Sequence, residues 1–145
     1  MKQLPTIKKI MTPFPYTIEI DASLQEAQNL MEEHRIHHLP VTEGGQLIGI
    51  LSERDISLTL SLTTGFSEKY EFDVRSACTP APYSVDMDAD LGEVLDQMIN
   101  RHIGSTVITR KGKSAGIITY TDICKALRDL LFAEKAPEPD QPSAA

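Results

Sequence analysis

The stretch GILSERD at residues 49–55 returns 67 residues later as GIITYTD at residues 116–122. Each stretch has a glycine, two apolar residues, a hydroxyl residue, two variable residues and an aspartate. The match extends outward without a gap, because MTPFPYT at 11–17 aligns with CTPAPYS at 78–84 in the same register. Self-similarity at one fixed offset is the signature of an internal repeat. We therefore predict two copies of one unit of about 55 residues.

Each copy carries the same predicted order of secondary structure. Apolar and β-branched runs at 16–20, 38–42 and 47–52 predict strands, and the helical spacing of Leu24, Ala27 and Met31 predicts a helix after the first of them. Ser23 and Glu26 predict a capping box at the start of that helix, and a second helix begins near Glu53. In the second copy the corresponding strands are 83–87, 105–109 and 114–119, and the helices are 91–101 and 120–132. The order βαββα in both copies predicts an α+β fold.

A unit of this size buries too little surface to be stable alone. We expect the two copies to pack through their sheets with pseudo-two-fold symmetry. The predicted boundaries are 7–62 for the first repeat, 63–73 for a linker, 74–132 for the second repeat and 133–145 for a disordered tail. The tail is rich in proline and has no apolar periodicity.

Composition excludes several classes of protein. With 14 basic and 21 acidic residues the net charge is −7, which argues against a general nucleic-acid binder. No apolar run is long enough to span a membrane, and the N-terminus lacks the apolar core of a signal peptide, so a cytoplasmic location is expected. Cys78 and Cys124 form neither a disulfide framework nor a CxxC zinc motif.

The repeated stretches, together with MTP at 11–13 and HLPV at 38–41, resemble the CBS domain family. Two such units in tandem resemble a Bateman module. The resemblance implies a stand-alone pair that binds adenosine-containing ligands in two clefts between the repeats, forms a homodimer through its helices and regulates an unknown protein. It implies a regulatory protein and not an enzyme.

The chemistry of the repeated stretch agrees with that implication. A strand that ends in Ser52 or Thr119 leads directly into a helix, whose first amides are unpaired donors and favour an anion. Asp55 and Asp122 lie one turn further on, where a carboxylate can accept both hydrogen bonds of a ribose diol. The alternative is local, since a hydroxyl residue and an acidic residue at this spacing also cap a helix. The two roles are compatible.

The resemblance, carried over residue by residue, implies two clefts. The residues of one are Ile50, Ser52, Arg54 and Asp55 with Pro82, Tyr83, Ile103 and Ser105. The residues of the other are Ile117, Thr119, Thr121 and Asp122 with Pro15, Tyr16, Ile36 and His37. The two tyrosines either cover an adenine or are half-buried strand aromatics, and Arg54 either contacts phosphate or is a solvated helix charge. The second stretch has YT where the first has ER, so the clefts should not be equivalent.

No metal or catalytic site is predicted. The helix that carries His34 should end near Ile36, so His34 and His38 would not share a helix face as metal ligands. His37 is the candidate phosphate contact. His38 is expected to lie at the start of the strand without a role in binding. There is no nucleophile elbow, Walker loop or HExxH, and no cofactor is required. An unrecognised hydrolase is the catalytic alternative.

The predicted function is a regulatory sensor of AMP, ADP, ATP or S-adenosylmethionine that acts on a partner protein by conformational change. The alternative is a ligand-independent module that dimerises and docks on an enzyme or transporter. Apolar residues at helical spacing within 123–132 predict a core helix or a dimer surface. Which nucleotide binds, and whether it fills one cleft or both, stays open.

Overall fold

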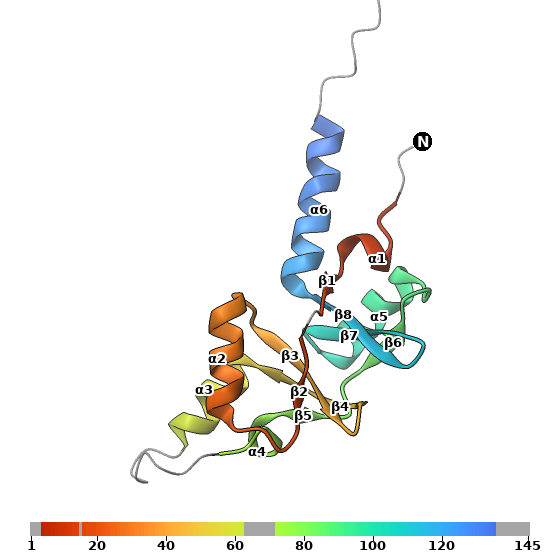
Figure 1. Ribbon diagram of the computed structural model, residues 1–145. Coiled ribbons are helices and arrows are strands. Elements are labelled where there is room, and N and C mark those ends of the chain that lie inside the picture. The colour runs from red at the N-terminus through yellow and green to blue at the C-terminus, as the bar shows by residue number, and fades with distance from the viewer. Residues whose placement is uncertain (1–3, 15, 63–71, 136–145) are drawn as a thin grey trace, which may run out of the picture.

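The computed structural model describes residues 4–14, 16–62 and 72–135. The elements of the first half are α1 (Ile7–Ile10), β1 (Thr12–Pro13), β2 (Ile18–Glu19), α2 (Leu24–His34), β3 (His38–Glu43), β4 (Gln46–Ser52) and α3 (Glu53–Ser61). Those of the second half are α4 (Val74–Ala77), β5 (Thr79–Pro80), β6 (Ser84–Asp86), α5 (Leu91–Arg101), β7 (Ser105–Arg110), β8 (Lys113–Thr119) and α6 (Tyr120–Lys135). Figure 1 shows α2, α3 and α4 with β2–β5 in one part of the molecule, and α1, α5 and α6 with β1 and β6–β8 in the other. The predicted α+β fold with two βαββα repeats is confirmed.

The predicted helix starts follow from local hydrogen bonds. Ser23 caps α2 and forms the predicted capping box with Glu26. Helix α2 ends at His34, two residues before the predicted end, because Arg35 adopts the left-handed conformation with φ 53°. The equivalent residue His102 ends α5 in the same way, with φ 53°. The two repeats therefore share this helix end although neither carries the usual glycine there.

Four short elements were not predicted, namely α1, β1, α4 and β5. They are two to four residues long, which is too short for a periodic pattern to identify. Strands β2 and β6 are also shorter than the predicted strands 16–20 and 83–87, because each pairs with its neighbour over only two or three residues.

The short strands β1 and β5 are exchanged between the repeats. Strand β1 pairs antiparallel with β8 of the second repeat, and β5 pairs antiparallel with β4 of the first. The sheets accordingly run β1-β8-β7-β6 and β2-β3-β4-β5. Each sheet thus takes one of its edge strands from the opening segment of the other repeat.

The glycine of each repeated stretch allows this exchange. A Cβ on Gly49 would lie 2.9 Å from the backbone oxygen of Thr79, and one on Gly116 would lie 2.7 Å from the backbone oxygen of Thr12. Real Cβ atoms do not approach a carbonyl so closely. These glycines are required for close approach of the exchanged strand and not for an unusual backbone angle.

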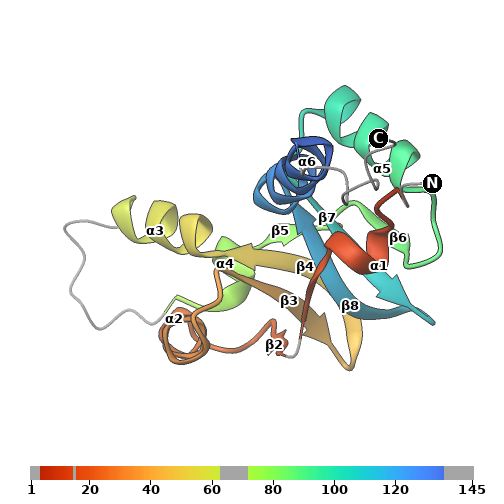
Figure 2. The same ribbon diagram turned by 90° about the horizontal axis from the view of Figure 1, so that it is seen from above.

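The core has three parts. One buried cluster lies between the first sheet and its helices, and a second lies between the other sheet and its helices. The third joins the two sheets, and its buried residues are Ile50, Val107 and Ile117. Figure 2 shows the sheets meeting at β4 and β8, with α2 and α3 on the side of one repeat and α5 and α6 on the side of the other.

Two predicted boundaries need correction. Phe72 and Asp73 belong to the predicted linker, but Phe72 packs against the first core and Asp73 caps α4. Residues 133–135 belong to the predicted tail, but they continue α6 because Ala, Glu and Lys are good helix formers. The rest of the predicted linker and tail lies outside the described residues.

Helix α6 leaves the body of the protein after its first turns (Figure 1). Ile123 packs against the second core, but Leu127, Leu131 and Phe132 are 56%, 53% and 62% exposed. The start of α6 therefore belongs to the core, and the other expected role, a dimer surface, stays a prediction for the exposed residues.

Candidate functional site

The first repeated stretch ends in a reciprocal cap. The Asp55 N–H donates to Ser52 Oγ at 3.0 Å, and the Ser52 N–H donates to Asp55 Oδ2 at 2.9 Å. Within the described part of the chain, the Asp55 carboxylate makes hydrogen bonds only with Ser52, and Asp55 is half-buried. The capping role is therefore present here, and it leaves lone pairs of the carboxylate for another donor.

The second stretch has a more enclosed carboxylate. The N–H and the hydroxyl of Thr119 donate to Asp122 Oδ2 at 2.8 and 3.1 Å. The hydroxyl of Thr12, on the exchanged strand β1, donates to Asp122 Oδ1 at 2.8 Å. Asp122 is only 7% exposed. The two aspartates are thus alike in sequence and different in environment.

Thr12 is a site residue that the sequence reasoning missed. Its contact spans 110 positions of the chain. The repeat itself contained one usable signal, because Thr12 and Thr79 are identical residues at equivalent positions. Only the strand exchange shows which aspartate lies beside Thr12.

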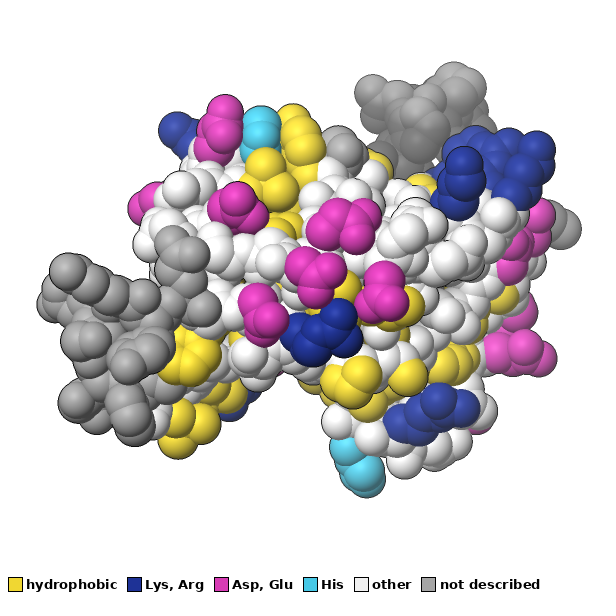
Figure 3. Space-filling model, turned by 60° about the horizontal axis from the view of Figure 1, so that its bottom comes forward, with side chains coloured by type: hydrophobic (Ala, Val, Ile, Leu, Met, Phe, Trp, Pro, Cys, Tyr) yellow, Lys and Arg dark blue, Asp and Glu magenta, His cyan; other side chains and the backbone are white. Residues whose placement is uncertain are grey.

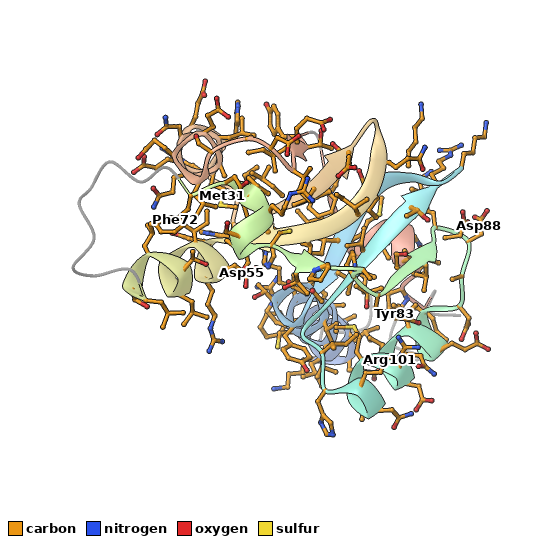
Figure 4. The ribbon with its side chains drawn as sticks, turned by 90° about the horizontal axis from the view of Figure 1, so that it is seen from below. Met31, Asp55, Phe72, Tyr83, Asp88 and Arg101 are labelled. Atoms are coloured by element: carbon orange, nitrogen blue, oxygen red, sulfur yellow. The ribbon has the colours of Figure 1, made fainter. Side chains whose placement is uncertain are left out.

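Both tyrosines predicted for the clefts pack against a helix of their own repeat. Tyr16 stacks on His34, with ring centroids 3.8 Å apart and planes at 17°. The Arg101 guanidinium lies 4.5 Å from the centre of the Tyr83 ring (Figure 4). His34 and Arg101 occupy equivalent positions at the ends of α2 and α5, so each tyrosine contacts the last residue of a helix in its own repeat, by ring stacking in one repeat and by a cation–π contact in the other. Both rings are half-buried, and their contact with an adenine stays a prediction.

The neighbouring histidines face different ways. His37 is 73% exposed, and its Nδ1 lies 2.6 Å from Oε2 of Glu53. In β3, Leu39 and Val41 pack in the helix-facing core, so the alternation of a strand turns His38 toward the other sheet. Burial lowers the pKa of His38, His37 lowers it further, and the carboxylates of Asp55 and Asp122 raise it. The contact of either histidine with a ligand stays a prediction.

The other predicted residues divide between the sheet junction, the helix-facing cores and the surface. Ile50 and Ile117 are buried between the sheets, 7% and 3% exposed. Ile36 and Ile103 pack against the helix-facing cores of their own repeats. Ser105 pairs with Thr119 across β7 and β8. Arg54 and Thr121 are exposed, Pro82 is half-buried, and Pro15 lies outside the described residues. Their contact with a ligand stays a prediction.

A cavity of about 440 Å³ beside the first stretch is lined by residues of α2 and α3, among them His37, Glu53 and Ser57, and does not include Asp55. A second cavity, of about 980 Å³, lies between α1, the start of α5 and Leu130 of α6, and none of the predicted site residues lines it. Among the described residues no cluster of His, Cys, Asp and Glu could hold a metal ion.

The distribution of surface charge and the length of the helices bear on what the protein could bind. Figure 3 shows acidic side chains spread over one face, with separate basic groups and small apolar patches. The Arg75 guanidinium lies 3.2 Å from the Asp21 carboxylate and 3.6 Å from the Glu43 carboxylate, so acidic side chains surround this positive charge. In the part of the chain that the structure describes, none of the helices has the length and apolar character to cross a bilayer.

Comparison with known proteins matches this architecture. The family model of the CBS domain matches residues 7–61 and 74–129. A zinc metalloprotease of Methanocaldococcus jannaschii is 30% identical over 128 residues, which are 88% of this chain and 34% of that protein. The chain therefore spans about a third of that relative's length.

Solved structures agree in fold. A Vibrio cholerae protein named as an acetoin utilization protein (AcuB) has a TM-score of 0.73 and 28% identity, over 94% of this chain and all of that one. A CBS domain pair in complex with 5'-methylthioadenosine and S-adenosylmethionine has a TM-score of 0.72 and 23% identity, over 85% and 99% of the chains. CBSX2 in complex with AMP has a TM-score of 0.70 and 21% identity, over 87% and 98%. The chain belongs to the CBS domain family, as two tandem CBS repeats whose sheets pack together.

Proposed function

We propose that this CBS pair is a regulatory module that binds an adenosine-containing ligand beside the repeated stretches and transmits binding to a partner protein. The observation that carries the proposal is the pair of strand-to-helix ends, Ser52 with Asp55 and Thr119 with Asp122, on two sheets that pack together. Each end offers helix N–H groups to a phosphate and a carboxylate to a ribose. CBS pairs of the same fold in complex with S-adenosylmethionine and with AMP support this ligand class.

The two ends should bind with different strength. Asp122 already accepts three hydrogen bonds and is almost fully buried. A ribose at Asp122 would have to displace or share the Thr12 hydroxyl, whereas Asp55 accepts only from Ser52 within the described part of the chain. We therefore expect Asp55 to hold the ribose at the stronger site. The ligand would be AMP, ADP, ATP or S-adenosylmethionine.

The exchanged strands provide a route from binding to a partner. Strand β1 connects α1 to the second sheet, and β5 connects α4 to the first. A ligand that changes the packing of the two sheets would move α1 and α4 with them. A partner or a second copy that contacts these helices could respond to that movement.

Calorimetric titration of the full chain with the four ligands tests this proposal. We expect saturable binding of at least one ligand, with a loss of about tenfold or more in affinity for Asp55→Ala, since hydrogen bonds to a charged group contribute about 1.5–3 kcal/mol. Asp96→Ala, on the exposed surface of α5, is the matched control and should bind as wild type. Heat that stays flat for all four ligands up to about millimolar would overturn the proposal.

The apolar surface of α6 favours a second candidate, a module that dimerises and docks on a partner without a ligand. Leu127, Leu131 and Phe132 are more than half exposed along the outer turns of one helix. Exposed apolar groups gathered on a helix mark a contact surface more often than isolated ones do. Sedimentation of wild type and of Leu131→Glu, with and without ligand, separates the two. Association that depends on Leu131 in the absence of ligand would favour the second candidate.

A further inference from the structure

Thr12 and Thr79 are equivalent residues at the start of the two exchanged strands. Thr12 opens β1, which pairs with β8, and Thr79 opens β5, which pairs with β4. The Thr12 hydroxyl donates to Asp122 Oδ1 at 2.8 Å. In the described part of the chain, no hydrogen bond joins Thr79 to Asp55. The two threonines are therefore placed alike in sequence and in strand order, and only Thr12 engages the aspartate beside it.

The contact with Thr12 occupies the last carboxylate oxygen of Asp122. The other oxygen, Oδ2, accepts the N–H and the hydroxyl of Thr119 at 2.8 and 3.1 Å. Asp122 is 7% exposed, whereas Asp55 is half-buried and its Oδ1 accepts no hydrogen bond within the described part of the chain. A ribose diol presents two donors to a carboxylate. Asp55 can accept them as it stands, and Asp122 can accept them only after the Thr12 hydroxyl has left Oδ1.

We propose that Thr12 sets the order in which the two ends take up ligand. Its hydroxyl keeps Asp122 closed to a ribose, so that ligand fills the Asp55 end first and the Asp122 end only at a higher concentration. This inference rests on the proposed function. It concerns the regulation of the same site, because one chain then responds to its ligand in two concentration ranges.

Opening the second end costs a hydrogen bond to a charged group, which is stronger than one between neutral groups. Thr12 is exposed, so its released hydroxyl can bind water. The rest of β1 need not move, since the Phe14 N–H donates to the Ala115 carbonyl at 2.9 Å and holds the end of the strand in place. Rotation of one side chain is therefore enough to open the site. A ligand must offset the cost of that rotation from its own contacts, which lowers its apparent affinity for this end.

Calorimetric titration of the full chain with AMP, ADP, ATP and S-adenosylmethionine tests the inference through Thr12→Ala, which removes the hydroxyl. Wild type should show one binding event, and a second that is about tenfold weaker or lies beyond about millimolar. In Thr12→Ala we expect the second event to appear or to become about tenfold tighter, because no hydroxyl has to be displaced. A Thr12 hydroxyl that served stability alone would not raise affinity when it is removed.

Three further variants separate the hydroxyl from other causes. Thr12→Ser keeps the hydroxyl and should return the second event to its wild-type affinity. Thr79→Ala is the matched control on the other exchanged strand and should strengthen neither event. Asp122→Ala added to Thr12→Ala should remove the second event, which assigns it to that end. Circular dichroism checks that each variant is folded, and replacement of the exposed Thr12 leaves no cavity in the core.

The inference is overturned if wild type fills two sites of equal affinity, or if Thr12→Ala binds at the second end no better than wild type. It is also overturned if Thr12→Ser or Thr79→Ala gains affinity as Thr12→Ala does, or if the second event survives the loss of Asp122. In all these cases ligand still binds, so the proposed function stands. If none of the four ligands binds wild type or Thr12→Ala up to about millimolar, the proposed function fails together with the inference.

Discussion

The two repeats align without a gap through their motifs, yet they differ around their aspartates. In the second repeat, Thr12 and Thr119 enclose Asp122, whereas in the first repeat Asp55 is half-buried and bonds only to Ser52 among the described residues. Thr12 reaches Asp122 through the exchanged strand β1, whereas the equivalent Thr79 makes no hydrogen bond to Asp55 among the described residues. Equivalent residues of a duplicated sequence can therefore make different contacts in the folded protein.

The repeats also differ in the residues next to the repeated stretches and in one residue of the buried core. Where the first has the exposed pair His37 and Glu53, the second has Gly104 under the Tyr120 ring, and a Cβ there would lie 3.2 Å from that ring. Where the first buries Leu39, the second buries Thr106, whose hydroxyl has no hydrogen-bond partner within the described part of the chain. The first repeat should therefore have the more stable core and the second the more enclosed carboxylate.

The largest expected effect comes from the motif glycines. Gly116→Ala places a methyl group 2.7 Å from a backbone oxygen, and we expect it to lower the free energy of unfolding by about 3 kcal/mol, measured by urea denaturation. Gly49→Ala, at 2.9 Å, should lower it by a similar or smaller amount. Gly92→Ala in α5 is the control, where the neighbour is a flexible carboxylate and alanine favours the helix. Equal stability of all three variants would contradict the role of the glycines in strand exchange.

Substitution of the two aspartates should affect stability and ligand affinity to different extents. Asp122→Ala leaves the Thr12 hydroxyl and the Thr119 N–H without their acceptor, so we expect a loss of about 2 kcal/mol in the free energy of unfolding. Asp55→Ala removes the acceptor of the Ser52 N–H in a capping box and should cost about 1 kcal/mol, with the larger loss in ligand affinity. Denaturation and titration of both variants measure the two effects. An opposite order in either measurement would mean that the two environments have been assigned wrongly.

The buried hydroxyl that distinguishes the core of the second repeat from that of the first can be removed by one substitution. Thr106→Val replaces a buried hydroxyl that has no described partner, and we expect stabilisation by about 1 kcal/mol in urea denaturation. Thr42→Val is the control, because the Thr42 hydroxyl donates to Glu19 Oε1 at 3.0 Å and its loss should destabilise. Destabilisation by Thr106→Val would indicate that the hydroxyl is satisfied by water.

The smallest expected effect is the pH dependence due to His38. In the unfolded chain this histidine titrates near its ordinary pKa of 6.5, whereas burial lowers the pKa in the folded protein. At a pH between the pKa of the folded protein and that of the unfolded chain, the unfolded chain binds more protons. The contribution of His38 to the free energy of unfolding is therefore fully present above about pH 6.5 and is lost as the pH falls from there through the pKa of the folded protein. Thermal unfolding at pH 7.5 and 5.5 should therefore show a smaller loss for His38→Ser than for wild type. An equal loss would indicate that His38 is solvated in the folded state.

Much of the local structure could be predicted from the sequence. The Ser23 and Glu26 capping box, the strand order and the start of α3 after Ser52 depend on residues a few positions apart. The capping alternative for Ser52 and Asp55 could be stated for the same reason. Strand alternation around Leu39 also places His38 on the opposite face of β3, and this can be read from the sequence.

The sequence by itself determined that the chain is a tandem repeat of two βαββα units, where most helices begin, and which glycine, hydroxyl and aspartate recur. These features are local, or they recur at one fixed offset, so residue patterns reveal them. Only the tertiary structure decided that β1 and β5 exchange sheets and that Thr12 encloses Asp122. These contacts join residues far apart in the chain. Their energies depend on how the two sheets pack, and no short stretch of sequence specifies that packing.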